Sequence, residues 1–189
     1  MTSPAYRDDR AHVFHSWSAQ GALDPLVVAG AEGSWFWDED GRRYLDFSSQ
    51  LVNANIGHQH PKMVEAIKAQ AERLCTIAPF HANDQRSEAA RLIAELAPGD
   101  LDMVFFTNGG AEATENAIRM ARLATGRHKV LATSRSYHGA TAGSITMTGD
   151  PRRWPSEPGL PGVVHVWGPY LYRSAFHATT DAEERGLDL

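Results

Sequence analysis

The sequence predicts an α/β fold with a mainly parallel sheet. In the second half of the chain, apolar runs at 102–107, 129–134 and 163–166 predict buried strands. Helical patterns lie between them, at 111–125 and within 140–148. Strands that alternate with helices in this way are typical of right-handed crossovers between parallel strands. The composition, 42% hydrophobic and 22% charged, is that of a globular protein with enough apolar residues for a core.

The first half of the chain predicts a different organisation. We expect residues 1–24 to form an irregular arm and residues 25–48 to form short strands around a hairpin turn at Asp40-Gly41. Two amphipathic helices are expected next, at 60–74 and 83–99. Their apolar stripes consist of Met63, Ile67, Ala71 and Leu74, and of Ala89, Leu92, Ile93 and Leu96.

Two further stretches complete the expected order of elements. The segment 149–162 is rich in proline and glycine and predicts a long surface loop. The acidic segment 181–189 predicts the approach to another helix.

Charge, cysteine content and hydropathy exclude several classes of function. The net charge of −5 and the pI near 6.0 do not favour nucleic acid or an anionic membrane surface as a partner. A single cysteine, Cys75, rules out an intramolecular disulfide and favours a reducing compartment. The first residues lack the apolar run of a signal peptide, and no window approaches the roughly 20 apolar residues of a membrane span. We therefore expect a cytoplasmic protein.

The stretch "TNGGAEA" suggests an anion site. Gly109 and Gly110 allow the backbone to approach a ligand closely, and the following helix offers free N–H groups and a positive dipole end to a phosphate. No lysine lies in the loop, so it is not a nucleotide-binding P-loop, and it does not follow G-x-G-x-x-G. From spacing alone, a tight turn with no ligand is an equal alternative.

A second candidate follows the strand predicted at 129–134. In "SRSYHGAT", the ring of Tyr137 could stack on a planar ligand. The alternatives are that Tyr137 is a packed surface aromatic residue and that His138 is a hydrogen-bonded loop residue. Ligands of open α/β sheets bind beyond the carboxyl ends of the strands. A phosphate cup on one strand end and an aromatic plate on another suit a ligand that carries both a phosphate and a flat ring.

These motifs resemble those of a known family. "FFTNGGAEATENAIRMAR" resembles the phosphate-binding segment of class III aminotransferases, pyridoxal-phosphate enzymes of fold type I, whose usual pattern is Phe-x-Asn-Ser-Gly-Ser-Glu-Ala before a helix. "SYHG" resembles the segment whose aromatic residue stacks on the pyridine ring. "GRRYLDFSSQLVNANIGHQHPKMVEAI" resembles the family's Tyr-x-Asp and Gly-His-x-His-Pro segments. The resemblance runs from about Trp17 to about Gly149.

The resemblance implies a cofactor, pyridoxal 5′-phosphate, and residues that bind it. It places Gly109, Gly110 and Ala111 at the cofactor phosphate, and Tyr137 and His138 at its ring. The loop then needs no lysine, because the family's lysine comes from far downstream.

The resemblance also implies substrate-binding residues and a domain division. Trp17, Leu51 and Val52 match positions that line the substrate pocket, although simple core packing explains them equally well. Residues 1–57 would be the N-terminal arm and hairpin of the small domain. Residues 58–189 would be the first, truncated part of the mainly parallel-sheet large domain, so the fold type I architecture would be incomplete.

This sequence departs from the family pattern in two ways. Gly109 and Ala111 replace the commoner serines of the phosphate cup, which removes hydroxyl donors but leaves the backbone N–H groups. The family's Schiff-base lysine, its pyridine-pairing aspartate and its substrate-gripping arginine fall beyond this chain. Lys62, Lys68 and Lys129 are not placed to replace that lysine, so we assign no catalytic residue and expect the chain alone to be inactive.

The resemblance implies an aminotransferase that moves an amino group from an amine or ω-amino acid to a 2-oxo acid. It is strongest to the taurine and β-alanine branch, with pyruvate as acceptor, and it implies a homodimer. The alternatives are an aminomutase or epimerase of the same fold, and a non-catalytic truncated remnant. We assign no metal site, because His58 and His60 lack a third ligand and suit a turn and a helix start.

Overall fold

The computed structural model describes residues 2–183 and divides into two compact units, which meet between Asp84 and Gln85. The domain boundary expected at 57/58 stays a prediction.

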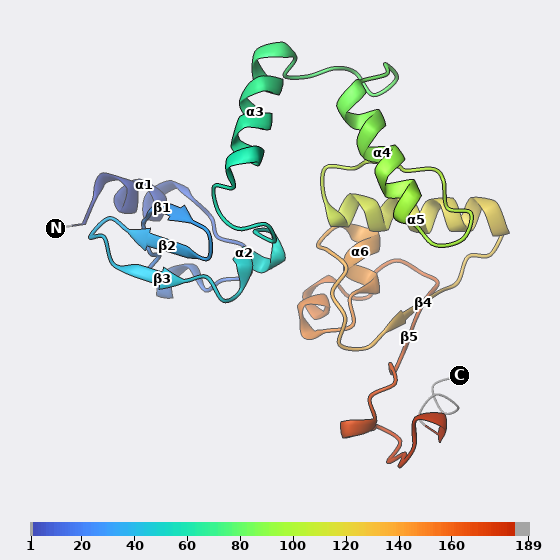
Figure 1. The fold of residues 1–189 in the computed structure, drawn as a ribbon. Helices are drawn as coiled ribbons and strands as arrows, with labels where there is room; N and C mark the ends of the chain where they lie inside the picture. The colour runs from blue at the N-terminus through green and yellow to red at the C-terminus, as the bar shows by residue number, and fades with distance from the viewer. Residues whose placement is uncertain (1, 184–189) are drawn as a thin grey trace. The chain divides into compact units, whose positions relative to one another are not determined.

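The first unit is built around a three-stranded antiparallel sheet (Figure 1). Its elements are α1 (Pro4–His12), η1 (Gln20–Ala22), β1 (Val28–Glu32), β2 (Trp35–Asp38), β3 (Arg43–Leu45), α2 (Ser49–Val52) and α3 (Pro61–Arg73). The predicted hairpin is confirmed: Phe36 pairs with Tyr44 across the turn. Gly41 takes the left-handed conformation that this turn requires, with φ of 78°.

The predicted irregular arm is partly wrong, because it contains the helix α1. The Oγ atom of Ser3 accepts a hydrogen bond from the Tyr6 N–H at 3.2 Å, and Pro4 takes the first helical position. A serine cap followed by proline is a recognised helix start. The signal was therefore in the sequence, although the segment has little apolar periodicity.

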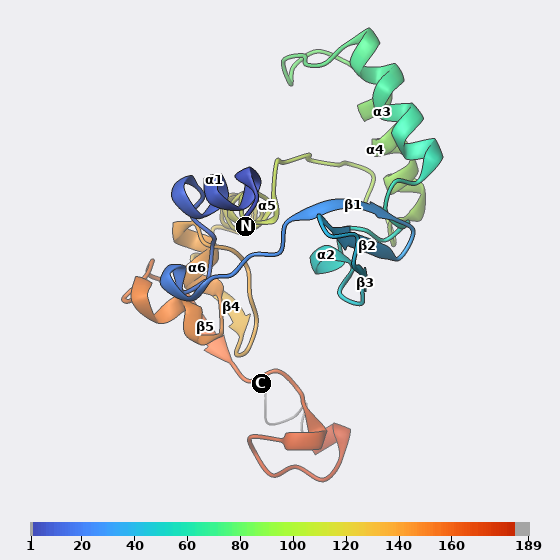
Figure 2. The ribbon, with the colours of Figure 1, turned by 90° about the vertical axis from the view of Figure 1, so that its left-hand side faces the viewer.

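The second unit contains α4 (Asp84–Leu96), α5 (Gly110–Thr125), β4 (Val130–Thr133), α6 (Ala142–Met147), η2 (Pro151–Ser156), β5 (Val163–Val166) and η3 (Leu171–Arg173). The strands β4 and β5 pair in parallel, which confirms the predicted crossover. The helix α6 lies beside both strands in Figures 1 and 2. The helices predicted at 60–74, 83–99, 111–125 and within 140–148 are confirmed as α3, α4, α5 and α6.

The strand predicted at 102–107 is wrong for the described structure. Residues 101–107 form neither helix nor strand, and the side chains of Met103, Phe105 and Phe106 are exposed. An apolar run becomes a strand only where a neighbouring strand completes its backbone hydrogen bonds. Within residues 2–183, the ladder of the second unit consists of β4 and β5 alone.

The expected loop at 149–162 and the expected helix approach at 181–189 differ in how far the structure describes them. The loop expected at 149–162 contains a 3₁₀ helix, η2, whose first turn is capped by the Asp150 carboxylate through the Arg152 N–H. The helix approach expected at 181–189 falls mostly outside the described residues. Among residues 2–183, no helix combines the length and the apolar character needed to span a membrane.

The interior of the second unit centres on α6. Ile145 and Ala132 are buried there, and Ser144 and Thr148 are fully enclosed. Their hydroxyl groups are satisfied locally: the Thr148 hydroxyl donates to the Ser144 carbonyl at 3.1 Å. This small polar interior fixes α6 and the loops on either side of it, which carry the candidate site.

Candidate functional site

The predicted phosphate cup is an open helix start. Gly109 precedes α5 in an extended conformation, and no side chain caps the helix there. A Cβ added at Gly109 or Gly110 would meet no atom within 4 Å, so the space around this backbone is open. The first N–H groups of a helix have no intrahelical acceptor, and the helix dipole favours an anion beside them. The backbone here offers what a phosphate needs.

A carboxylate of α5 fixes the loop that leads into this helix. The Glu112 carboxylate accepts a hydrogen bond from the Asn108 N–H at 2.8 Å. The Thr107 hydroxyl donates to the Gly109 carbonyl at 3.1 Å. These bonds lie on the chain just before the glycines and leave the N–H groups of Gly110 and Ala111 uncapped by side chains.

The loop that carries Tyr137 lies against the start of α5. A Cβ added at Gly139 would be 2.7 Å from the Ala111 Cβ atom and 2.5 Å from the Ser144 Oγ atom. The backbone of Gly139 has φ of 133°, a conformation that side-chain-bearing residues rarely adopt. Glycine at this position therefore lets the loop that carries Tyr137 pack against the start of α5 within one unit.

Hydrogen bonds hold this loop in place. The His138 N–H donates to the Thr148 hydroxyl at 3.1 Å. The Gly149 N–H donates to the Ser136 carbonyl at 2.9 Å, and the Arg135 N–H donates to the Gly149 carbonyl at 3.0 Å. The bonds fix the backbone on both sides of Tyr137.

One face of the Tyr137 ring is covered by a cation. The guanidinium carbon of Arg152 lies 3.9 Å from the centre of that ring. The Asp150 carboxylate accepts hydrogen bonds from the Arg152 Nε atom at 2.9 and 3.1 Å, and these bonds hold the pKa of Asp150 below its ordinary value. Tyr137 is 42% exposed, so part of its ring stays accessible to a ligand. This pair was not predictable from the sequence, because Arg152 lies in a segment expected to be a surface loop.

The carboxylate of Glu115 ties α5 to α6. Its Oε1 atom accepts hydrogen bonds from the Thr141 hydroxyl at 2.6 Å, the Gly143 N–H at 2.7 Å and the Ser144 N–H at 3.1 Å. The Thr141 bond first, and then the two backbone bonds, hold the pKa of Glu115 below its ordinary value against the opposing effect of desolvation. A Cβ at Gly143 would be 2.3 Å from Glu115 Oε2, so a larger residue there would displace the Glu115 carboxylate from these bonds. From the sequence, the favourable dipole at the start of α5 is enough to account for a glutamate at position 115. The sequence therefore does not indicate that Glu115 also bonds to α6.

The predicted substrate-binding residues belong to the first unit. Trp17, Leu51 and Val52 all have positive φ, at 56°, 58° and 67°. All three are exposed, Leu51 at 85% and Val52 at 71%, so the described structure does not pack them in a core. Their meeting with the cofactor-binding residues stays a prediction.

The histidines and lysines have ordinary positions. The Nε2 atom of His58 lies 2.7 Å from the Asp46 carboxylate, and His60 directly precedes α3. No cluster of three or more potential metal ligands occurs in residues 2–183. Two of the lysines lie on α3, where Lys68 pairs with Glu65, and Lys129 precedes the amino end of β4.

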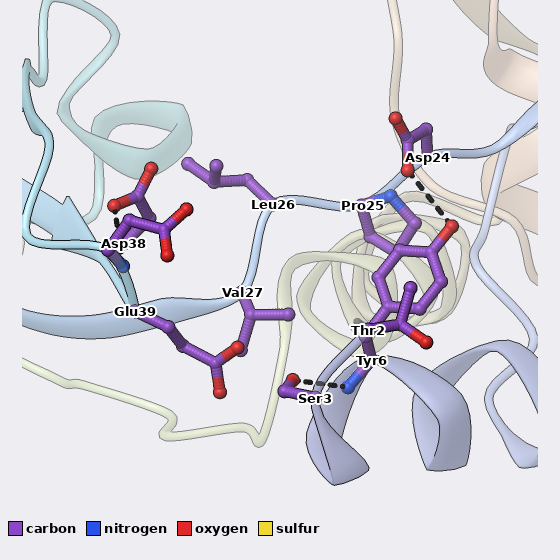
Figure 3. A pocket seen from close by; sticks show the side chains of 10 residues that line it. Thr2, Ser3, Tyr6, Asp24, Pro25, Leu26, Val27, Asp38 and Glu39 are labelled. Carbon is purple, nitrogen blue, oxygen red and sulfur yellow. Dashed lines mark hydrogen bonds between the residues drawn. The ribbon is translucent and has the colours of Figure 1, made fainter.

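A separate cavity of the first unit has no link to these motifs. It measures ≈ 560 Å³ and lies between the start of α1, the segment 24–27 and the end of β2 (Figure 3). The Tyr6 hydroxyl donates to Asp24 at 2.9 Å on its wall, and Asp38, Glu39 and Asp40 make it acidic. None of the eight predicted site residues lines it. An acidic wall does not suit a phosphate.

Comparison with known families agrees with the motifs. The profile of the family described as Aminotransferase class-III matches residues 17–186. The acetylornithine aminotransferase of Methanopyrus kandleri is 42% identical over 143 residues, which are 75% of this chain and 37% of the relative. The isoleucine 2-epimerase of Lentilactobacillus buchneri is 36% identical over 171 residues, 88% of this chain and 38% of the relative. The chain thus spans little more than a third of these curated relatives.

Comparison with solved structures agrees with the fold. The taurine:2-oxoglutarate aminotransferase from Bifidobacterium kashiwanohense, solved with PLP and glutamate, superposes with a TM-score of 0.90 at 40% identity. That match covers 97% of this chain and 42% of the other. Nearly the whole chain therefore matches a contiguous architecture that continues further in the solved protein.

The tie through Glu115 leads to a testable expectation for stability. We expect Glu115→Gln to lower the free energy of unfolding at pH 7 by about 1–3 kcal/mol, since a charged acceptor of three hydrogen bonds is lost. Because the folded state lowers the pKa of Glu115, its contribution is present above the unfolded pKa and is lost as pH falls through the folded pKa. The difference between the two proteins should therefore shrink in acid. Urea unfolding of both at a series of pH values measures it.

Glu72→Gln is the matched control, because Glu72 is exposed on α3. This control should leave stability nearly unchanged at every pH. A Glu115→Gln protein as stable as its parent at pH 7, or a difference that does not narrow in acid, would contradict the role of the carboxylate.

Proposed function

The chain belongs to the class III aminotransferase family and has its fold type I architecture, and from this premise we propose that it binds pyridoxal 5′-phosphate and serves the transfer of an amino group from an ω-amino acid to a 2-oxo acid. Because the chain spans only part of its relatives, the proposal concerns the holoenzyme, the complete polypeptide with its cofactor. The alternative functions differ either in the amino donor or in the fate of the amino group.

One observation carries the proposal: the close approach of Gly139 to Ala111. It brings the loop that carries Tyr137 against an uncapped helix start within one unit. A phosphate at the α5 terminus and a planar ring beside Tyr137 match the two ends of pyridoxal phosphate. The open space at Gly109 and Gly110 leaves room for the phosphate, so the residues present fit the cofactor.

The residues of this chain would bind the cofactor and orient it. When bound, pyridoxal phosphate supplies the electron sink for chemistry at the substrate's amino-bearing carbon. The N–H groups of Gly110 and Ala111 and the dipole of α5 hold the phosphate, without the serine hydroxyl groups common in the family. Tyr137 holds the ring by stacking, with Arg152 against its other face. Glu115 keeps both parts in register by joining α5 to α6.

The proposed donors are taurine, β-alanine and related ω-amino acids, with pyruvate as acceptor. The support is the resemblance of "FSSQLVN" and "TNGGAEA" to that branch and the similarity to a taurine:2-oxoglutarate aminotransferase. The relatives also favour a second donor, acetylornithine. Holoenzyme assays with each donor, and with pyruvate or 2-oxoglutarate as acceptor, separate these possibilities. Turnover of acetylornithine alone would overturn the proposed donor class.

A second candidate reaction is epimerisation, which the similarity to an isoleucine 2-epimerase supports. An epimerase inverts an amino acid without a 2-oxo acid acceptor, whereas the proposed aminotransferase needs one. Chiral analysis of the amino acid with and without acceptor distinguishes the two. We further propose a cytoplasmic homodimer, and a mass measurement that finds an active monomer would overturn the dimer.

The stacking role of Tyr137 is testable in the holoenzyme. We expect Tyr137→Ala to weaken cofactor retention on dialysis by about two- to tenfold, because stacking of one ring contributes about 0.5–1.5 kcal/mol. Tyr137→Phe is the matched control, since it keeps the ring and should retain the cofactor. The cofactor content and the absorbance spectrum after dialysis are the measurements. Unchanged retention in Tyr137→Ala would remove Tyr137 from the site.

The 189-residue chain alone should not catalyse transamination. The reaction needs a lysine that acts as base beside the cofactor. Lys62 and Lys68 lie on α3, and Lys129 lies at the wrong end of its strand. We expect amine-to-pyruvate transfer no faster than with free cofactor, and no cofactor trapped on a lysine by borohydride. Turnover above that rate, or mass-spectrometric detection of a trapped cofactor, would contradict this expectation and support the chain as a complete catalyst.

A further inference from the structure

The turn α2, Ser49–Val52, has an unusual handedness. All four of its residues have positive φ, between 48° and 67°, and none is glycine. Side-chain-bearing residues avoid this region because Cβ approaches the following carbonyl oxygen. A run of such residues persists only where the surroundings hold it.

The buried carboxylate of Asp46 stabilises the turn by hydrogen bonds. Its Oδ1 atom accepts hydrogen bonds from the Gln50 N–H at 3.2 Å and from the Ser48 hydroxyl at 3.5 Å. Its Oδ2 atom lies 2.7 Å from the Nε2 atom of His58. The Asp46 side chain is 3% exposed and that of His58 is 18% exposed, so water competes little for these bonds.

Asp46 and His58, which we call the clamp, are attached to the sheet of the first unit. His58 and Gly33 exchange two backbone hydrogen bonds, at 2.8 and 3.0 Å, which fix His58 beside the β1–β2 turn. On the other side, the Asn53 side-chain amide donates to the Gln50 carbonyl at 2.8 Å. Burial would raise the pKa of Asp46, but the bonds from His58 and Gln50 outweigh it and keep the pKa lowered, so the Asp46 carboxylate is charged at neutral pH.

The turn presents apolar side chains outward. Leu51 and Val52 are among the exposed large apolar residues of the first unit, although each occupies a strained backbone position. A core-packing role would bury them, and the described structure does not. Backbone strain of this kind is typical of functional sites. Here a buried carboxylate maintains the strained turn, and the turn exposes two apolar side chains.

We propose that Asp46, acting with His58, is a positioning residue that enforces the left-handed turn and so sets the wall that Leu51 and Val52 present to the amino substrate. The proposal rests on the proposed function, because only as an aminotransferase of this family would the chain use Leu51 and Val52, by resemblance, to line the substrate pocket. Asp46 itself touches neither substrate nor cofactor in this assignment.

Kinetics of the holoenzyme test the clamp. We expect Asp46→Ala to raise KM for the amino donor roughly tenfold while kcat and the absorbance of the bound cofactor change little, because a misplaced wall weakens substrate binding. Adding Gln50→Gly should restore much of the affinity, since glycine adopts positive φ without a clamp. Gln50→Ala is the matched control and should not restore it. An unchanged KM, or equal rescue by alanine, would overturn the proposal.

A second measurement does not require the Asp46→Ala protein to fold. Gln50→Gly alone should raise the thermal midpoint above that of Gln50→Ala, because only glycine relieves the strain at φ 48°. A midpoint for the glycine variant at or below that of the alanine variant would overturn the clamp. A holoenzyme without any transamination would overturn the proposed function instead, while this comparison of midpoints would still test the turn.

Discussion

The candidate site depends on a single carboxylate oxygen. Glu115 Oε1 receives three hydrogen bonds from the start of α6 while its own backbone belongs to α5. The cup lies at the first residues of α5, and the loop with Tyr137 leads directly into α6. With the two helices joined, Gly139 can rest against Ala111. The packing of the Tyr137 loop against the start of α5 follows from this tie and from glycine at 139.

Local signals predicted local structure well. The hairpin at Asp40-Gly41 and the helices α3 to α6 follow from turn residues, caps and apolar periodicity, which act within a few residues along the chain. The strand at 102–107 failed because a strand depends on a partner, and its apolar pattern alone cannot supply one. The helix α1 was missed because its cap, Ser3-Pro4, stands before a polar segment without an apolar stripe.

The motifs of the candidate site stood out in the sequence, whereas the contacts that support them did not. Gly109, Gly110 and Tyr137 received roles from the family resemblance, since their spacing alone left a plain turn and a packed aromatic residue as alternatives, and these roles stay predictions. Glu115 and Arg152 act on partners that are distant in sequence or lie across a loop, at Thr141 and Tyr137. No spacing rule reports such contacts, so only three-dimensional structure reveals them.

The left-handed turn has a consequence for how the protein folds. An unfolded chain rarely visits left-handed conformations at non-glycine residues, so four in succession form no nucleus by themselves. The bond that compensates is the one that Asp46 accepts from the Gln50 N–H, and Asp46 is in turn held by His58, whose backbone pairs with that of Gly33. We therefore expect residues 49–52 to take their final conformation after the sheet has formed, so that substitutions there would change the unfolding rate more than the folding rate.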